Sequence, residues 1–346
     1  MPVLFVLGAG CSRNYAQSIH RIRGLRSPLD HDFFKMAKLV IENTGMMSDS
    51  LFMEDIESLI QTIAPLYGHS QYDISFLEKP ALSLEEVMTL LDIDLKLFSS
   101  RTAPAKGLYE SSQLRILKEL LVRVLDYSLY GPPCRKHLGL ARRMQSGDVV
   151  LNFNYDILMD NALFSLGKMV DSGYCLSFFK VNQNEQWTNP DESSSEISLI
   201  KLHGSLNWIR CGFCGSLLLY RYRKQTMLGA YTFECPKCSA TQPHAVRLMV
   251  PPIQSKEYGD KDISYLWIKA DQMLRDFSKV VCIGYSFPLS DFDMVSLMRR
   301  YRARRTTVPE VDFVSPDLRA KKRLESILGV KDARRFENLS HYLQSN

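Results

Sequence analysis

Four cysteines in the second half of the chain have the spacing of a metal site. Two Cys-x-x-Cys pairs, separated by twenty residues, contain Cys211, Cys214, Cys235 and Cys238. Each pair can place two thiolates on one tetrahedral ion, and four thiolates are a common ligand set for structural Zn²⁺. Such a site is closed to substrate. We therefore expect Zn²⁺ that holds this segment together; four unrelated thiols are the alternative.

A glycine-rich turn follows the first apolar run of the chain. After residues 3–7 come Gly8, Ala9, Gly10, Cys11 and Ser12. Glycines let backbone N–H groups approach a phosphate, and a serine at a helix start adds a donor. A tight turn from strand to helix without a ligand would have the same sequence, and the complete Gly-x-Gly-x-x-Gly pattern is absent. The turn is a candidate phosphate site that needs support from other residues.

Polar or small residues also end four later apolar runs. The runs are 149–153, 197–202, 280–284 and 311–314, and the candidate residues at their ends are Asn154 with Asp156, His203, Gly284 with Ser286, and Ser315. An amide can hold a water or a ribose hydroxyl, a carboxylate can accept from a carboxamide, and a histidine can act as a general base near neutral pH. Helix capping would also explain Asn154 and Asp156, and a lone histidine is often structural.

The elements that must position these residues are strands alternating with helices. Such alternation predicts a Rossmann-like, doubly wound parallel α/β sheet, in which ligands bind at the carboxyl ends of the strands. Helical periodicity, for example at Leu114, Leu117 and Leu121, fills much of the stretch between the first two runs. We expect a Rossmann-like domain from residues 1–12, 146–205 and 246–346, a helical insertion at 13–145 and a zinc ribbon at 206–245.

The composition is that of an ordinary globular protein. Of 346 residues, 45% are hydrophobic and 23% charged, which allows a sizeable core and excludes a disordered tail, a fibre or a membrane bundle. No apolar run approaches the length of a membrane span, and the chain start lacks the features of a secretory signal. We expect a cytoplasmic protein with no membrane contact.

The charge balance does not indicate nucleic-acid binding. The net charge is only +5, although residues 299–305 contain five arginines and one tyrosine. This arginine run could bind phosphates, as in nucleic acid, or an acidic partner, or it could form a solvated helix face.

Taken in order, these features resemble the sirtuin family. GAGCS, NFNYD, KLHGS, the two Cys-x-x-Cys pairs and GYSFP follow one another as in that family, and the likeness is greatest to its divergent prokaryotic SIR2-like branch. The resemblance covers about residues 3–12 and 149–317. The helical stretch between them has no close counterpart in the deacylase sirtuins.

The resemblance implies roles for particular residues. It places the NAD diphosphate at the glycine turn and the nicotinamide ribose and carboxamide near the NFNYD segment. In GYSFP, Tyr285 stands where the family usually has threonine. The implied cofactor-binding residues are Gly8, Ala9, Gly10, Ser12, Asn154, Asp156, Gly284, Ser286 and Ser315, and the implied catalytic residues are Asn154, Asp156 and His203.

One departure from the family pattern bears on the reaction. Its deacylases follow the glycine turn with Gly-Ile-Pro-Asp-Phe-Arg, whereas the nearest stretch here, residues 26–34, lacks the final arginine. We therefore expect an NAD⁺ glycohydrolase that gives nicotinamide and ADP-ribose, similar to NAD-depleting effectors of bacterial anti-phage defence. The alternatives are an NAD-dependent protein deacylase and a zinc-ribbon module that binds nucleic acid or a partner and senses a nucleotide.

An enzyme that destroys NAD⁺ without a second substrate would poison its own cell unless its activity were held off. The sheet, the helical insertion and the zinc segment occupy nearly all of the chain, so we expect control by other chains. Residues 112–129 form a candidate helix for self-association, although burial of this helix within its own domain is the alternative. We expect a homo-oligomer that works with a separately encoded protein partner.

Overall fold

The computed structural model describes residues 2–13, 15–70, 73–79, 82–98, 112–181, 187–189, 194–219, 235–239, 245–253, 256, 260–274, 277–288 and 290–345. The chain divides into two compact units. The first comprises Met1–Gln17, Gly131–Val250 and Asp260–Asn346, and the second comprises Ser18–Tyr130 and Pro251–Gly259. The three-part division expected from the sequence, with boundaries at residues 12, 145, 205 and 245, stays a prediction.

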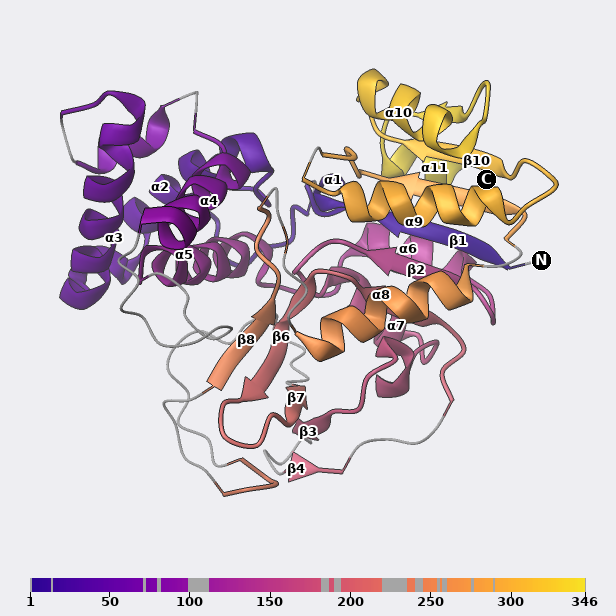
Figure 1. The fold of residues 1–346 in the computed structure, drawn as a ribbon, viewed down its shortest axis with the longest axis horizontal. Helices are drawn as coiled ribbons and strands as arrows, with labels where there is room; N and C mark the ends of the chain where they lie inside the picture. Colours follow the sequence, from indigo (N-terminus) through magenta and orange to yellow (C-terminus); the bar gives the residue numbers. More distant parts are fainter. Residues whose placement is uncertain are drawn as a thin grey trace. The chain divides into compact units, whose positions relative to one another are not determined.

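A six-stranded parallel sheet forms the centre of the first unit (Figure 1). From edge to edge its strands are β11 (Arg334–Phe336), β10 (Glu310–Val314), β9 (Lys279–Ile283), β1 (Val3–Leu7), β2 (Val149–Asn152) and β5 (Ser198–Lys201). Every neighbouring pair is parallel. Numbered in chain order, the strands run 6-5-4-1-2-3, so the order reverses between β1 and β9. Ligands of such sheets bind beside the carboxyl ends at this reversal.

The register of the central strands brings their carboxyl ends to one level. Leu7 at the end of β1 is opposite both Asn152 of β2 and Ile283 of β9. Asn152 is in turn opposite Lys201 of β5. The predicted Rossmann-like sheet is thereby confirmed, and the residues that directly follow β1, β2, β5 and β9 emerge along the same edge.

Helices of the first unit pack beside this sheet. They are α1 (Ala9–Ser12), α6 (Arg135–Arg143), α7 (Leu158–Ser165), α8 (Lys261–Met273), α9 (Phe292–Ala303), α10 (Leu318–Leu328) and α11 (Leu339–Ser345), with a 3₁₀ turn, η6, at Asp171–Tyr174. Helix α9 contacts both α8 and α10, and α6 contacts both α7 and α11. Strands β2 and β9 are almost continuously buried, as expected for a parallel sheet covered by helices.

A second, smaller sheet belongs to the same unit. Its five strands are β4 (Trp187–Thr188), β3 (Phe179–Val181), β7 (Leu217–Leu219), β6 (Gly204–Cys211) and β8 (Ala245–Met249), in that spatial order. Strand β6 is antiparallel to both β7 and β8. The predicted zinc ribbon falls in this region, but the strands themselves were not predicted, because they are short and lack clear alternation of apolar and polar residues.

The second unit is helical. Its elements are η1 (Asp30–Asp32), α2 (Phe33–Asn43), η2 (Gly45–Ser48), α3 (Ser50–Ile63), η3 (Ala64–Tyr67), η4 (Ile74–Glu78), α4 (Leu84–Ile93), the π-helical turn η5 (Asp94–Phe98) and α5 (Ser112–Leu129). Helix α5 packs on α2, α3 and α4. The predicted periodic residues Leu114, Leu117 and Leu121 are buried, so burial within the fold, and not self-association, uses this apolar face. Among the described residues, no helix is long and apolar enough to cross a membrane.

Candidate active site and metal centre

The turns that follow β1 and β9 lie directly against each other. The amide of Gly8 donates to the carbonyl of Ile283 at 3.0 Å, and the amide of Gly10 donates to the carbonyl of Gly284 at 2.9 Å. Gly284 has a φ of +62°, and a Cβ atom on Gly10 would lie 2.8 Å from the Gly284 Cα atom. The two turns can approach this closely only because both positions lack a side chain.

This contact changes the interpretation of the glycine turn. The amides of Gly8 and Gly10 donate across to the β9 turn, and the amide of Cys11 donates to the Gly8 carbonyl at 2.9 Å. In the structure these glycines join the two central turns of the sheet, as a tight turn without a ligand also would. Ala9 is exposed and Ser12 is buried. A phosphate contact by any residue of this turn stays a prediction.

Ser12, Asn154 and Asp156 form a buried hydrogen-bonded cluster. The Ser12 hydroxyl donates to Asp156 Oδ2 at 2.7 Å, and Asn154 Nδ2 lies 3.4 Å from the same hydroxyl. Asn154 Nδ2 also donates to the Gly8 carbonyl at 3.0 Å. Asp156 Oδ1 accepts from the Leu158 amide at the start of α7, at 3.0 Å. Asp156 thus contacts the first residue of α7, although the N-cap residue of that helix is Ile157, and it also links the β2 turn to the β1 turn.

Lys201 supports this cluster from inside the sheet. Its ammonium group is fully buried, donates to the main-chain oxygen of Asp156 at 2.5 Å and pairs with Asp160 at 3.3 Å. The hydroxyl of Tyr174 donates to the same Asp160 carboxylate. Burial raises the pKa of Asp160, and the nearby Lys201 charge opposes that increase. Lys201 is the first residue of the KLHGS segment, but the sequence assigns it no role, because its partners lie more than forty positions away in the chain.

His203 follows β5 and is surrounded by aromatic rings. It is 6% exposed, and the ring of Phe153 meets its imidazole edge-on with centroids 5.1 Å apart. The next residue, Gly204, has a φ of +78°, and a Cβ atom there would lie 2.0 Å from the Leu248 carbonyl oxygen. Glycine is therefore required where the chain turns from the large sheet into β6 against β8.

Asp291 is a neighbour of His203 that the sequence analysis missed. Its Oδ1 atom lies 3.6 Å from His203 Nε2, and its Oδ2 atom accepts a hydrogen bond from the Tyr285 hydroxyl at 2.6 Å. The Tyr285 ring stacks on Phe153 with centroids 4.5 Å apart. Asp291 is the third residue after Pro288, which ends the GYSFP segment. A carboxylate so close to a strand-end turn was the sequence signal that could have identified it. This group of residues comes from the turns after β2, β5 and β9.

Burial of the candidate catalytic residues differs from the expectation. Their positions directly after strands suggest that Asn154 and His203 are exposed. In the structure they are 7% and 6% exposed. The neighbouring turns and aromatic side chains cover these strand ends, so substitution of either residue will also affect packing.

The remaining predicted residues lie on the turns after β9 and β10. Ser286 is exposed, while its neighbour Phe287 is buried and has a left-handed backbone with a φ of 53°. The Ser315 hydroxyl accepts from the Asp317 amide at 3.3 Å, at the start of α10. Ser286 and Ser315 thus occupy the expected edge of the sheet, but no hydrogen bond joins them to the Ser12 cluster among the described residues.

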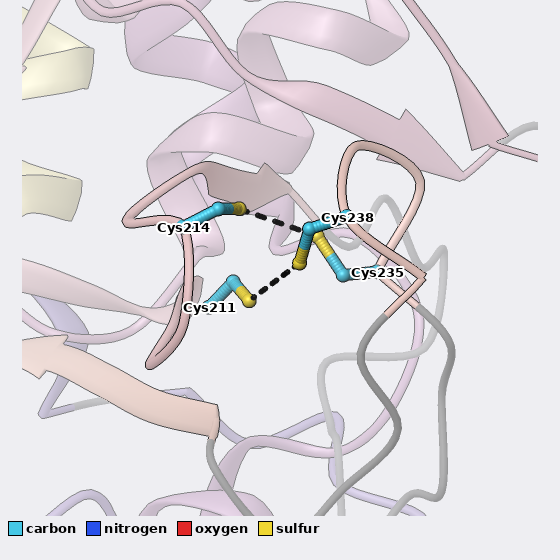
Figure 2. Close-up of side chains that lie close together, drawn as sticks. All are labelled: Cys211, Cys214, Cys235 and Cys238. Atoms are coloured by element: carbon cyan, nitrogen blue, oxygen red, sulfur yellow. Dashed lines mark hydrogen bonds between the residues drawn. The ribbon is translucent and has the colours of Figure 1, made fainter.

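The four predicted metal ligands converge (Figure 2). The sulfur atoms of Cys211, Cys214, Cys235 and Cys238 all lie within 4.8 Å of one another. The Cys211–Cys238 and Cys214–Cys235 sulfur pairs are 3.7 Å and 3.6 Å apart. Four thiolates at 2.3 Å from a tetrahedral Zn²⁺ would be about 3.8 Å apart. The donor set and its spacing therefore fit structural zinc.

The first cysteine pair lies at the turn between β6 and β7. Gly215 has a φ of +70°, and the guanidinium group of Arg210 donates to its carbonyl at 3.1 Å. Burial raises the pKa of Cys214, but hydrogen bonds with Ser216 and with the other cysteines outweigh it and lower the pKa to about 6. Strand β6 begins just after His203 and ends at Cys211, so one strand connects the candidate active site to the metal centre.

The arginine run at 299–305 has partners within the molecule. Arg300 and Arg304 both pair with Asp271 of α8, at 2.9 Å and 2.6 Å. Hydrogen bonding from Arg300, followed by Arg304, lowers the pKa of Asp271 to about 2. The run lies at the carboxyl end of α9, where positive charge is favourable. Contact of this run with nucleic acid stays a prediction.

No family model matches the chain, and no curated protein matches it. The structure is similar at low identity to solved Sir2 structures. A Sir2 homologue mutant in complex with ADP-ribose is 13% identical with a TM-score of 0.40, covering 74% of this chain and 86% of that one. A Sir2 homologue mutant in complex with 2′-O-acetyl ADP-ribose is 14% identical with a TM-score of 0.38, covering 68% and 75%. A structure described as a basis for sirtuin substrate affinity is 13% identical with a TM-score of 0.32, covering 62% and 70%.

Proposed function

We propose that this protein hydrolyses NAD⁺ at the bond between nicotinamide and ribose. One juxtaposition supports the proposal. Ser12, Asn154 and Asp156 are hydrogen-bonded together at the ends of β1 and β2, on one side of the reversal of strand order, and His203 follows β5, the next strand of the sheet. This is where open α/β sheets bind nucleotides, and the residue types suit cleavage of a glycosidic bond.

The proposed reaction needs a positioned water and a proton acceptor. The glycosidic C–N bond breaks with its electron pair leaving on nicotinamide, and positive charge develops on the ribose. A water oxygen bonds to the ribose carbon and gives up one proton. In this proposal His203 accepts that proton and passes it to solvent, so that nicotinamide and ADP-ribose are the products.

Asn154 and Asp156 would orient the substrate. Asn154 uses its amide nitrogen to hold the Gly8 carbonyl, and among the described residues no hydrogen bond reaches its Oδ1 atom. That oxygen can accept from a water or a ribose hydroxyl. Each oxygen of Asp156 accepts one internal hydrogen bond and retains capacity for one more, which suits the nicotinamide carboxamide.

The remaining contacts of NAD⁺ in this proposal come from the neighbouring turns. Ala9 and Ser12, held in place by Gly8 and Gly10, would contact the diphosphate. Gly284, Ser286 and Ser315 would lie toward the adenosine half, because they follow β9 and β10 on the far side of the reversal. Zn²⁺ at the four cysteines would have a structural role only.

The choice between water and an acyl-lysine as acceptor is open to direct test. Purified protein is incubated with NAD⁺, with and without an acetylated peptide, and the products are separated by chromatography. We expect nicotinamide and ADP-ribose without peptide, and a His203→Ala variant serves as the inactive control. Strict dependence of nicotinamide release on the peptide, with O-acyl-ADP-ribose as a product, would establish the deacylase alternative instead. A protein that binds a nucleotide but does not cleave NAD⁺ would favour the alternative of a zinc-ribbon module that senses a nucleotide.

We further propose that the enzyme is an NAD-depleting effector of bacterial anti-phage defence. Unrestrained NAD⁺ hydrolysis would be toxic, so a homo-oligomer or a separately encoded partner would control it. Light scattering combined with the NAD⁺ assay tests this control. A monomer at micromolar concentration that cleaves NAD⁺ fully by itself would contradict it, whereas activity that appears only in an assembled state would support it.

A further inference from the structure

The carboxylate of Asp291 does not cap helix α9, although Asp291 lies at the start of that helix. Asp291 occupies the N-cap position of α9, where an aspartate usually accepts a hydrogen bond from the first turn and stabilises the helix by about 1 kcal/mol. Here its side chain makes no capping hydrogen bond. The carboxylate is directed instead to the Tyr285 hydroxyl and to His203 Nε2.

Burial makes this orientation significant. Asp291, Tyr285 and His203 are 5%, 4% and 6% exposed. A buried carboxylate is costly unless it is hydrogen-bonded or paired with a cation. Tyr285 supplies the hydrogen bond at 2.6 Å, and His203 at 3.6 Å becomes the cation when its imidazole takes up a proton. The pairing is therefore strongest in the protonated state of His203.

We propose that Asp291 is a positioning residue that orients the His203 imidazole and balances its positive charge, with Tyr285 holding the Asp291 carboxylate in place. Its role in catalysis rests on the proposed NAD⁺ hydrolysis. During that reaction the proton released by water moves to the imidazole, and Asp291 stabilises the imidazolium without taking the proton. The pairing itself is a property of the protein without substrate and can be tested separately.

The effect of the Asp291 charge can be measured through the protonation of His203. Asp291, at the start of α9, and Tyr155, in the turn after β2, are titratable groups that face the imidazole. Burial raises the pKa of Tyr155 well above its usual range, so this group is neutral near pH 7. Phe153 covers another side of the ring. A change in charge at Asp291 should therefore shift the protonation of His203.

The first test is NMR titration of the protein labelled with ¹³C-histidine. The His203 ring signal is assigned by its loss in a His203→Gln variant. We expect Asp291→Asn to move the His203 midpoint to lower pH by on the order of one unit, because the imidazolium loses its counter-charge. Tyr285→Phe should cause a smaller shift in the same direction, and Asp293→Asn, which removes a charge two residues away, should cause none. An unchanged midpoint in folded Asp291→Asn and Tyr285→Phe proteins would overturn the proposal.

The second test is the steady-state kinetics of NAD⁺ cleavage. Asp291→Asn should lower kcat about tenfold or more, with KM nearly unchanged, because in this proposal Asp291 does not touch the substrate. Tyr285→Phe should lower kcat by a smaller factor, in the same order as the shifts of the His203 midpoint. A loss of kcat in Asp291→Asn without a shift of the His203 midpoint would show that Asp291 acts independently of His203. A shifted midpoint in a protein that never releases nicotinamide would contradict the proposed function and leave the pairing intact.

Discussion

The ammonium group of Lys201 lies 2.5 Å from the main-chain oxygen of Asp156 and 3.3 Å from the carboxylate of Asp160. A fully buried charge thus holds the turn that carries Asn154 and Asp156. Removing one partner of such a buried pair leaves the other without compensation, which is more costly than never having the pair.

We predict that Lys201→Met destabilises the protein by about 3–5 kcal/mol, because it leaves the Asp160 charge buried and unpaired. Urea unfolding monitored by fluorescence measures the change. The double variant Lys201→Met/Asp160→Asn removes both charges and keeps an acceptor for Tyr174, so it should be more stable than the single variant. Equal or greater destabilisation in the double variant would show that the ion pair is not the cause.

Gly204 and Gly167 provide a matched comparison of glycine requirements. Both have left-handed backbones, but a Cβ atom on Gly204 would lie 2.0 Å from the Leu248 carbonyl oxygen, whereas one on Gly167 would meet nothing within 4 Å. Gly167→Ala should therefore cost only about 1–2 kcal/mol of backbone strain. Gly204→Ala should cost clearly more, about 3 kcal/mol or above, because the contact of β6 with β8 must open. Similar melting temperatures for the two variants would contradict this account.

The metal centre should contain about one Zn²⁺ per chain, bound by the four thiolates. Elemental analysis of protein purified without chelators measures the ratio. Cys211→Ser and Cys238→Ser should lose the metal and lower the melting temperature, because the metal would join the turn between β6 and β7 to the segment that carries Cys235 and Cys238. Cys175→Ser, outside the cluster, should retain the metal. Freshly purified protein without zinc would rule out the site.

We predict that Asn154→Ala and His203→Ala abolish NAD⁺ cleavage, measured as nicotinamide release. Asn154→Ala should also cost about 1 kcal/mol of stability, because the Gly8 carbonyl loses one of its two hydrogen bonds. Asn161→Ala, on α7, serves as the control and should retain activity. Wild-type turnover in both folded variants would show that the sirtuin-like roles do not apply to this chain.

Local patterns were sufficient for several parts of the structure. The strands β1, β2, β5, β9 and β10 coincide within one or two residues with apolar runs, because a strand covered on both faces is mostly apolar. The Cys-x-x-Cys spacing was sufficient to predict that the four cysteines form a cluster, since each pair constrains its two sulfur atoms over one tight turn. The periodic leucines of α5 were similarly sufficient for that helix.

Contacts between residues at the ends of different strands could not be predicted from the local sequence. Lys201 reaches Asp156 and Asp160 over forty-five and forty-one positions, and Asp291 reaches His203 over a still longer separation. Such contacts depend on strand order and register, which bring residues to one edge of the sheet whatever their distance in the chain. The same packing made Gly8 and Gly10 a contact surface for the β9 turn, and it buried Asn154 and His203 where strand position alone suggested exposure. The candidate residues could therefore be recognised individually in the sequence, but the contacts among them are decided by the folded sheet.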